Sequence, residues 1–135
     1  MVYSQANLVY AESVSQNSRE YRNFIHPLHN KATKLDHVYW FRNFMRWCEE
    51  SKVVSGHDDF ESLLGMNSDE ITDLLLDWID SEKLKGNKGV TIASKICAAE
   101  TFFEMNRKIW HSKGNLIPGT FLRLHVFNSN FGFHF

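Results

Sequence analysis

Residues 90–111 read VTIASKICAAETFFEMNRKIWH and place apolar side chains along two neighbouring stripes of a helix. A helix that is apolar over so much of its circumference usually lies at the centre of a bundle. We therefore predict an all-α fold, a compact bundle of four to five helices around this one. The first stripe holds Ile92, Ile96, Ala99, Phe103 and Trp110, and the second holds Ala98, Phe102, Met105 and Ile109.

A second long helix is predicted over residues 31–50, after a good N-cap residue at Asn30. Its far side carries Lys31, Arg42 and Arg46 and is therefore partly basic. The opposite stripe recurs at spacings of three and four residues, which indicates a face turned to the core. This stripe comprises Thr33, His37, Phe41, Phe44 and Cys48.

Two further helices are predicted between these. A short one covers residues 58–64 and ends at Gly65. A longer one begins at Ser68, an N-cap residue, and buries a core-facing stripe. That stripe comprises Ile71, Leu74, Leu75, Trp78 and Ile79, whereas the opposite face carries Asp73, Asp77 and Asp80.

The two ends of the chain are predicted to lie outside this bundle, which is expected to span residues 30–115. Residues 1–29 are rich in Ser, Asn and Gln and are expected to form a flexible arm with a short helix at 19–25. Residues 116–135 end in the stretch FLRLHVFNSNFGFHF, which contains five Phe and a single charged residue, Arg123. Because this stretch has neither helical nor strand periodicity, an irregular tail is expected there.

Charge is strongly segregated along the chain, although the formal net charge is only −1. Residues 49–82 carry eleven acids and one base, whereas residues 83–113 carry seven bases and two acids. Residues 31–46 add four bases and one acid. Segregation of this kind creates a basic face on a nearly neutral protein, unless the blocks fold against each other and neutralise.

Motifs for catalysis are missing from the sequence. There is no Gly-x-Ser-x-Gly turn for a nucleophile and no glycine-rich loop that would cradle phosphates. The two cysteines, Cys48 and Cys97, lie far apart, and His26 and His29 are the only close pair among seven histidines. We therefore expect no enzyme activity, no metal, no cofactor and no small-molecule substrate.

The basic segments indicate contact with duplex DNA. The turn at 86–89 leads into a helix N-terminus, whose unpaired N–H groups and positive dipole suit a phosphate. Lysines beside that turn add long-range attraction, and the outer face of the helix over 31–50 can reach phosphates or base edges. The alternative is that these are ordinary solubilising side chains. The candidate contact residues are Lys31, Arg42, Arg46, Lys85, Lys88, Thr91, Lys95, Arg107 and Lys108.

The order of motifs over residues 30–115 resembles the N-terminal core-binding domain of tyrosine recombinases, the phage-type integrases. The first long helix of that SAM-like helical domain matches here at Asn30, Thr33, His37, Phe41, Phe44 and Trp47. The middle helix matches at 71–79, and the last helix opens with Gly89, Thr91 and Ile92 and continues with Ile96, Ala99, Phe102 and Phe103. The following Met105, Asn106 and Trp110 look most like the archaeal branch.

The resemblance implies DNA integration or recombination, but the catalytic half of that family has no counterpart here. Only about twenty residues follow Asn115, no His-x-x-Arg occurs, and none of the four tyrosines lies in the C-terminal part. We therefore expect a non-catalytic DNA-binding module, a truncated integrase. The alternatives are a helical module that pairs with an intact recombinase or another partner, and a decayed gene product.

The expected location follows from what the sequence lacks. No apolar run is long enough to span a membrane, and residues 1–10 show no secretory signal. We expect a cytoplasmic protein that associates with the nucleoid when it binds DNA.

Overall fold

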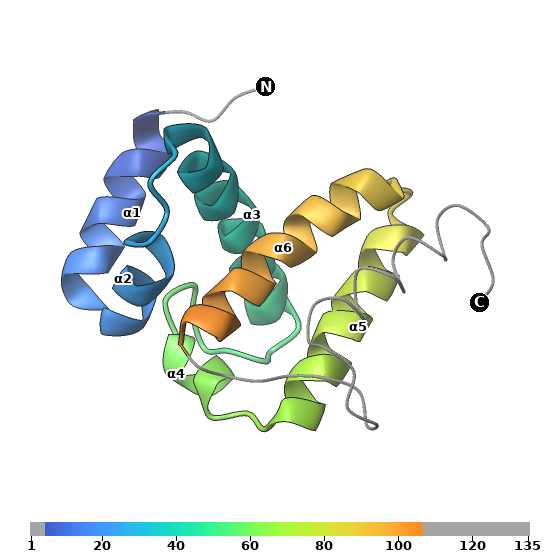
Figure 1. Ribbon diagram of the computed structural model, residues 1–135. Helices are drawn as coiled ribbons and strands as arrows, with labels where there is room; N and C mark the ends of the chain where they lie inside the picture. Colours follow the sequence, from blue (N-terminus) through green and yellow to red (C-terminus); the bar gives the residue numbers. More distant parts are fainter. Residues whose placement is uncertain (1–4, 107–135) are drawn as a thin grey trace.

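The computed structural model describes residues 5–106, and Figure 1 shows them as an assembly of helices without strands. The all-α fold is thus confirmed, with six helices in the described part rather than four to five. None of these helices has the length and apolar content needed to cross a membrane. The six are α1 (Gln5–Asn17), α2 (Arg19–Ile25), α3 (Lys31–Glu50), α4 (Phe60–Leu64), α5 (Ser68–Leu84) and α6 (Gly89–Met105).

Helix α6 is the central element. It crosses α3 and also packs on α2 and α5, so α1 and α2 lie to one side of it and α5 to the other (Figure 1). Its Ile96, Ala99, Phe102 and Phe103 are fully buried. The central position predicted from its two apolar stripes is therefore confirmed.

Aromatic rings tie the helices together around Phe102. The ring of Phe102 stacks on Phe41 of α3 at a centroid distance of 4.5 Å. It also lies 5.8 Å from the ring of Phe24 in α2 and 5.6 Å from the ring of Phe60 in α4. Aromatic pairs at these separations stabilise a fold beyond their buried area, so one side chain links four helices.

The N-terminal segment differs from the arm that was expected. The short helix predicted at 19–25 is confirmed as α2, but α1 precedes it and packs on α2 and α3. Tyr21 and Phe24 are fully buried and Ala11 nearly so, so residues 5–28 form part of the core. Helix α1 contributes Ala11 to the core and packs Tyr10 and Val14 against it, and a polar contact to α3 adds to this, as described below.

Side-chain caps set the starts of α3 and α5, and one of the two differs from the cap that the sequence predicted. The cap at Asn30 is confirmed, since its side chain accepts from the Thr33 N–H at 3.1 Å. Helix α5 is capped by Asn67 rather than Ser68, because Asn67 and Glu70 exchange two hydrogen bonds of 2.9 Å in a capping box.

In the described residues helix α6 runs from Gly89 to Met105, and the remainder of the helix predicted to His111 lies outside them. The side chain of Asn106 donates to the carbonyls of Glu20 and Phe102 and accepts from Asn23. These bonds occupy the end of α6 and fasten it to α2. Residues 107–111 and the tail predicted at 116–135 lie outside the described residues.

The turn between α5 and α6 is a Schellman motif. The N–H of Gly86 donates to the carbonyl of Lys83 at 2.9 Å, and the N–H of Asn87 donates to the carbonyl of Glu82 at 3.2 Å. Gly86 has a φ of +86°, a conformation that costs an L-residue roughly 1–2 kcal/mol. The side chain of Asn87 also donates to Glu82 at 2.8 Å, where such motifs usually have an apolar contact.

Candidate nucleic-acid interface

The outer face of α3 presents two of its three candidate cations to solvent. Lys31 and Arg46 are exposed, and neither forms an ion pair with another described residue. They lie fifteen positions apart, roughly 22 Å along the helix axis. Two phosphate contacts from one helix face are therefore possible, but they are widely spaced.

Arg42, the third candidate on α3, is engaged inside the protein. Its guanidinium donates to the side-chain oxygen of Asn7 at 2.8 Å and stacks 3.9 Å from the centre of the Tyr10 ring. Asn7 is itself buried. Arg42 thus holds α1 against α3, and the structure removes it from the set of free cations.

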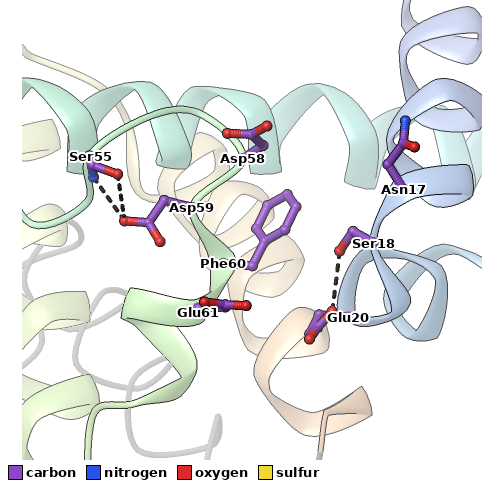
Figure 2. A pocket seen from close by; sticks show the side chains of 8 residues that line it. All are labelled: Asn17, Ser18, Glu20, Ser55, Asp58, Asp59, Phe60 and Glu61. Atoms are coloured by element: carbon purple, nitrogen blue, oxygen red, sulfur yellow. Dashed lines mark hydrogen bonds between the residues drawn. The ribbon is translucent and has the colours of Figure 1, made fainter.

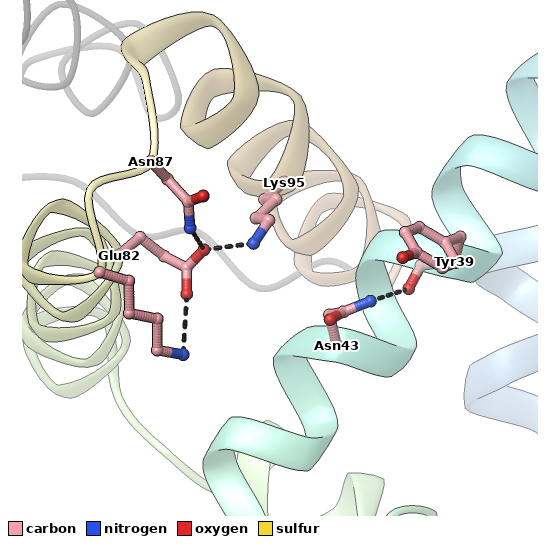
Figure 3. Close-up of polar contacts among 6 residues, drawn as sticks. Tyr39, Asn43, Glu82, Asn87 and Lys95 are labelled. Atoms are coloured by element: carbon pink, nitrogen blue, oxygen red, sulfur yellow. Dashed lines mark hydrogen bonds and ion pairs between the residues drawn. The ribbon is translucent and has the colours of Figure 1, made fainter. Parts of the chain in front are cut away.

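Lys95 is also engaged in the interior rather than at the surface. It is only 9% exposed, forms an ion pair with the buried Glu82 and lies 5.1 Å from the centre of the Trp40 ring. Figure 3 shows Asn87 and Lys95 converging on Glu82 from two sides. A side chain held in this way positions the α5–α6 hairpin and does not reach a phosphate.

The pKa of Glu82 reflects these contacts. Burial pushes the pKa of this carboxyl up, but the hydrogen bonds and charges of Lys95 and Lys85 outweigh burial and hold it below its usual range. Glu82 is therefore ionised at neutral pH and compensates both lysines. Sequence reasoning missed Glu82 because it is one of eleven acids in a block that otherwise covers a solvated face.

The start of α6 keeps the features expected of a phosphate-binding turn. Lys88 occupies the N-cap position, is exposed, and makes no side-chain cap, whereas Ser18, Asn30, Asp59 and Asn67 cap α2 to α5. Thr91 is half-buried in the first turn. Lys85 approaches Glu82 at 3.3 Å while 57% of its side chain remains exposed. The first N–H groups of α6 thus have no side-chain acceptor.

A cavity of about 220 Å³ is lined by three of the predicted contact residues, Arg46, Lys85 and Lys95. Arg46 comes from α3 and Lys85 follows the end of α5, and both line this cavity, with the Lys95–Glu82 pair in its wall. The remaining lining residues are Asn43, Trp47, Glu50 and Trp78. Of the nine candidates, Arg46, Lys85 and Lys95 therefore line one cavity, Lys31 does not, and Arg107 and Lys108 fall outside the described residues.

Acidic side chains gather on a different part of the molecule. A pocket of about 340 Å³ between α2 and α4 is lined by Glu20, Asp58, Asp59 and Glu61 (Figure 2). Hydrogen bonds from the Ser55 N–H and from the Ser62 hydroxyl lower the pKa of Asp59 to about 2. This side of the protein repels a polyanion. A polyanion would therefore have to bind elsewhere on the surface, where the charge is positive.

Within the described residues, the acidic and basic blocks pair with each other only where α5 meets α6. Among residues 5–106 three ion pairs form, Asp80–Lys83, Glu82–Lys85 and Glu82–Lys95, all near the α5–α6 hairpin. Most acids of the block at 49–82 therefore remain unpaired, and so do Lys31, Arg46 and Lys88. The acidic block therefore keeps most of its charge uncompensated by ion pairs, whereas Lys88 is the one base among residues 83–106 that forms no ion pair with a described residue.

Cys48 is fully buried, and burial raises the pKa of its thiol to about 12, so it is a protonated core residue. Within residues 5–106 no three His, Cys, Asp or Glu side chains gather as metal ligands would.

His37 links α3 to α6. Its Nδ1–H donates to the Thr33 carbonyl at 3.0 Å, and Nε2 faces the Thr101 hydroxyl at 3.3 Å. Burial lowers the pKa of this imidazole, although the Thr33 carbonyl and Asp36 act in the opposite direction. The ring is therefore neutral when the helices are packed at neutral pH.

We expect His37 to make the fold sensitive to mild acid. Its pKa is lower in the folded than in the unfolded chain, so the unfolded chain binds the proton first as pH falls below about 6.5. The stabilisation is complete above that pH and is lost as pH falls toward the folded pKa. The free energy of unfolding, measured with urea at pH 7.5 and 5.5, should change less in His37→Gln than in the parent chain. A change as large in His37→Gln as in the parent would contradict this, and His26→Gln, at an exposed site, is the control.

Comparison with known proteins identified no relative of this chain. No family model matches it, and no curated protein or solved structure is significantly similar. The resemblance to the core-binding domain of tyrosine recombinases therefore rests on the sequence motifs and stays a prediction.

Proposed function

We propose that this protein is a non-catalytic module that binds duplex DNA through one basic surface, formed by Lys31, Arg46, Lys85 and Lys88. The observation that carries the proposal is that Arg46 and Lys85 line one cavity. A phosphate placed there would meet a guanidinium and an ammonium.

The charge distribution supports a one-sided contact. Among the described residues, no ion pair joins the four cations of the basic surface to the acids of the pocket lined by Glu20, Asp58, Asp59 and Glu61. Contacts to phosphates give affinity but do not recognise the base sequence. We therefore expect micromolar binding whose affinity falls steeply as the salt concentration rises. The core-binding domain of a tyrosine recombinase, which the sequence resembles, is the setting in which such a module would act. Pairing with an intact recombinase belongs to the same proposal.

The proposal is tested by removing two free cations of the basic surface. Because Arg46 and Lys88 are exposed and unpaired, Arg46→Ala/Lys88→Ala should fold like the parent chain. Each lost phosphate contact lowers the slope of log K against log salt by about 1, so the slope should fall by about 2 and the affinity at ~50 mM salt by about tenfold or more. Fluorescence anisotropy with a labelled duplex measures both.

Arg19→Ala provides the matched control, because Arg19 is exposed at the start of α2, outside the basic surface. It should leave the slope and the affinity close to those of the parent. If Arg46→Ala/Lys88→Ala binds with the parent slope, the basic surface is not where DNA lies.

A further inference from the structure

The tip of the α5–α6 hairpin exposes two aliphatic side chains. Leu84, the last residue of α5, is 90% exposed, and Val90, in the first turn of α6, is 68% exposed. Two of the four exposed large apolar side chains in residues 5–106 thus lie six positions apart across a single turn. Exposed apolar side chains that lie close together and are bordered by polar residues are typical of a surface that binds a partner.

The tip is held rigidly. The Schellman bonds close the turn at Gly86, and the Asn87 and Lys95 side chains both bind the buried Glu82 beneath it (Figure 3). Lys95 is in turn held over the Trp40 ring of α3. The two aliphatic side chains therefore project from a turn anchored to the core rather than from a mobile loop.

Three lysines lie near the apolar tip in sequence. Lys83 and Lys85 flank Leu84 and pair with Asp80 and Glu82, whereas Lys88, which precedes the turn of α6 that carries Val90, forms no ion pair with a described residue. Lys85 and Lys88 are exposed, and the first N–H groups of α6 have no side-chain acceptor. This combination complements a partner that is both anionic and able to accept apolar groups in its interior.

Two polyanions have that chemistry, an anionic lipid surface and duplex DNA. A single myristoyl chain gives only marginal membrane binding, with an association constant of about 10⁴ M⁻¹, and Leu84 and Val90 together offer about half its carbon atoms. Minor-groove proteins, in contrast, insert only one or two aliphatic wedges between base pairs while flanking cations hold the phosphates. The tip has the size of such a wedge and is too small for a lipid anchor.

We propose that Leu84 and Val90 form an apolar wedge that enters the minor groove of the bound duplex and partly unstacks a base step. The wedge rests on the proposed DNA binding and extends it from a backbone contact to a deformation of the DNA. Lys85 and Lys88 would lie over the phosphates that border the groove, which is about 6 Å wide. Steps that unstack easily would then bind better than stiff ones, without any base-specific hydrogen bond.

The test compares the full chain with Leu84→Ala/Val90→Ala on a short A·T-rich duplex that contains 2-aminopurine, whose fluorescence rises when it unstacks. The parent chain should raise this fluorescence. The double variant should bind about five- to tenfold more weakly without raising it, and should keep the parent slope against salt because no cation is lost. Val9→Ala removes an equally exposed aliphatic side chain on α1 and should behave like the parent.

Each contrary outcome identifies what has failed. If the parent binds duplex with the expected salt dependence but the double variant binds equally well and 2-aminopurine stays stacked in both, the wedge is overturned and the DNA binding stands. If the parent binds no duplex at ~50 mM salt, the proposed function fails and the wedge with it. If the parent floats with phosphatidylserine-containing vesicles, the double variant does not, and both bind duplex alike, the tip serves a lipid surface instead.

Discussion

Replacement of Phe102 by alanine should lower the free energy of unfolding by about 3–5 kcal/mol. Phe102 is fully buried in α6 and touches rings from α2, α3 and α4, so its loss leaves a cavity that several helices border. Domains of this size are stable by about 5–15 kcal/mol, so the variant should be largely unfolded at moderate urea concentrations. Urea denaturation followed by circular dichroism measures the change.

Met105→Ala is the matched control for that experiment, because Met105 is on the same helix and 42% exposed. We expect it to change the free energy of unfolding by about 0.5 kcal/mol or less. A cost below about 1 kcal/mol for Phe102→Ala would contradict the central place assigned to α6.

Lys95→Met should be nearly as damaging, with an expected loss of about 3 kcal/mol. Methionine fills the space of the lysine stem but leaves the carboxylate of Glu82 buried without its main partner. Lys85 and Asn87 still contact Glu82, which places the cost at the lower end of the range for broken buried pairs. Thermal and urea unfolding at pH 7 measure it.

The double variant Glu82→Gln/Lys95→Met separates a charge effect from a packing effect. Because it buries no uncompensated charge, it should be more stable than Lys95→Met alone. The cost of Lys95→Met should also shrink as pH falls toward the ordinary glutamate range, where Glu82 without Lys95 takes up a proton. Equal stability of the single and the double variant would show that packing, not charge, holds Lys95.

Local sequence patterns predicted most of the fold. The cap at Asn30, the apolar faces of α3, α5 and α6 and the short α2 follow from side chains close together in sequence. Such features depend on interactions over three or four residues, which a single sequence displays directly. The contacts of Asn106 with Glu20 and Asn23 could not be predicted in this way, because those residues lie more than eighty positions away.

The candidate site was harder to predict, because long-range pairing decides which cations are free. Arg42 and Lys95 have the same side-chain types and helical spacing as true surface cations, yet α1 binds one and Glu82 binds the other. The apolar residues of helix α1 follow no strong helical periodicity, so its packing was not predictable from a stripe, and the contact with Arg42 adds to it. Only the folded arrangement distinguishes these two cations from Arg46 and Lys88.

The most direct test of the account is the binding of the full chain to a short duplex at salt concentrations from ~50 to ~200 mM. With four phosphate contacts from the basic surface, log K should fall linearly against log salt with a slope of about −3.6, roughly a hundredfold loss of affinity over that range. Binding that does not change with salt, or no binding at ~50 mM salt, would contradict DNA binding through Lys31, Arg46, Lys85 and Lys88.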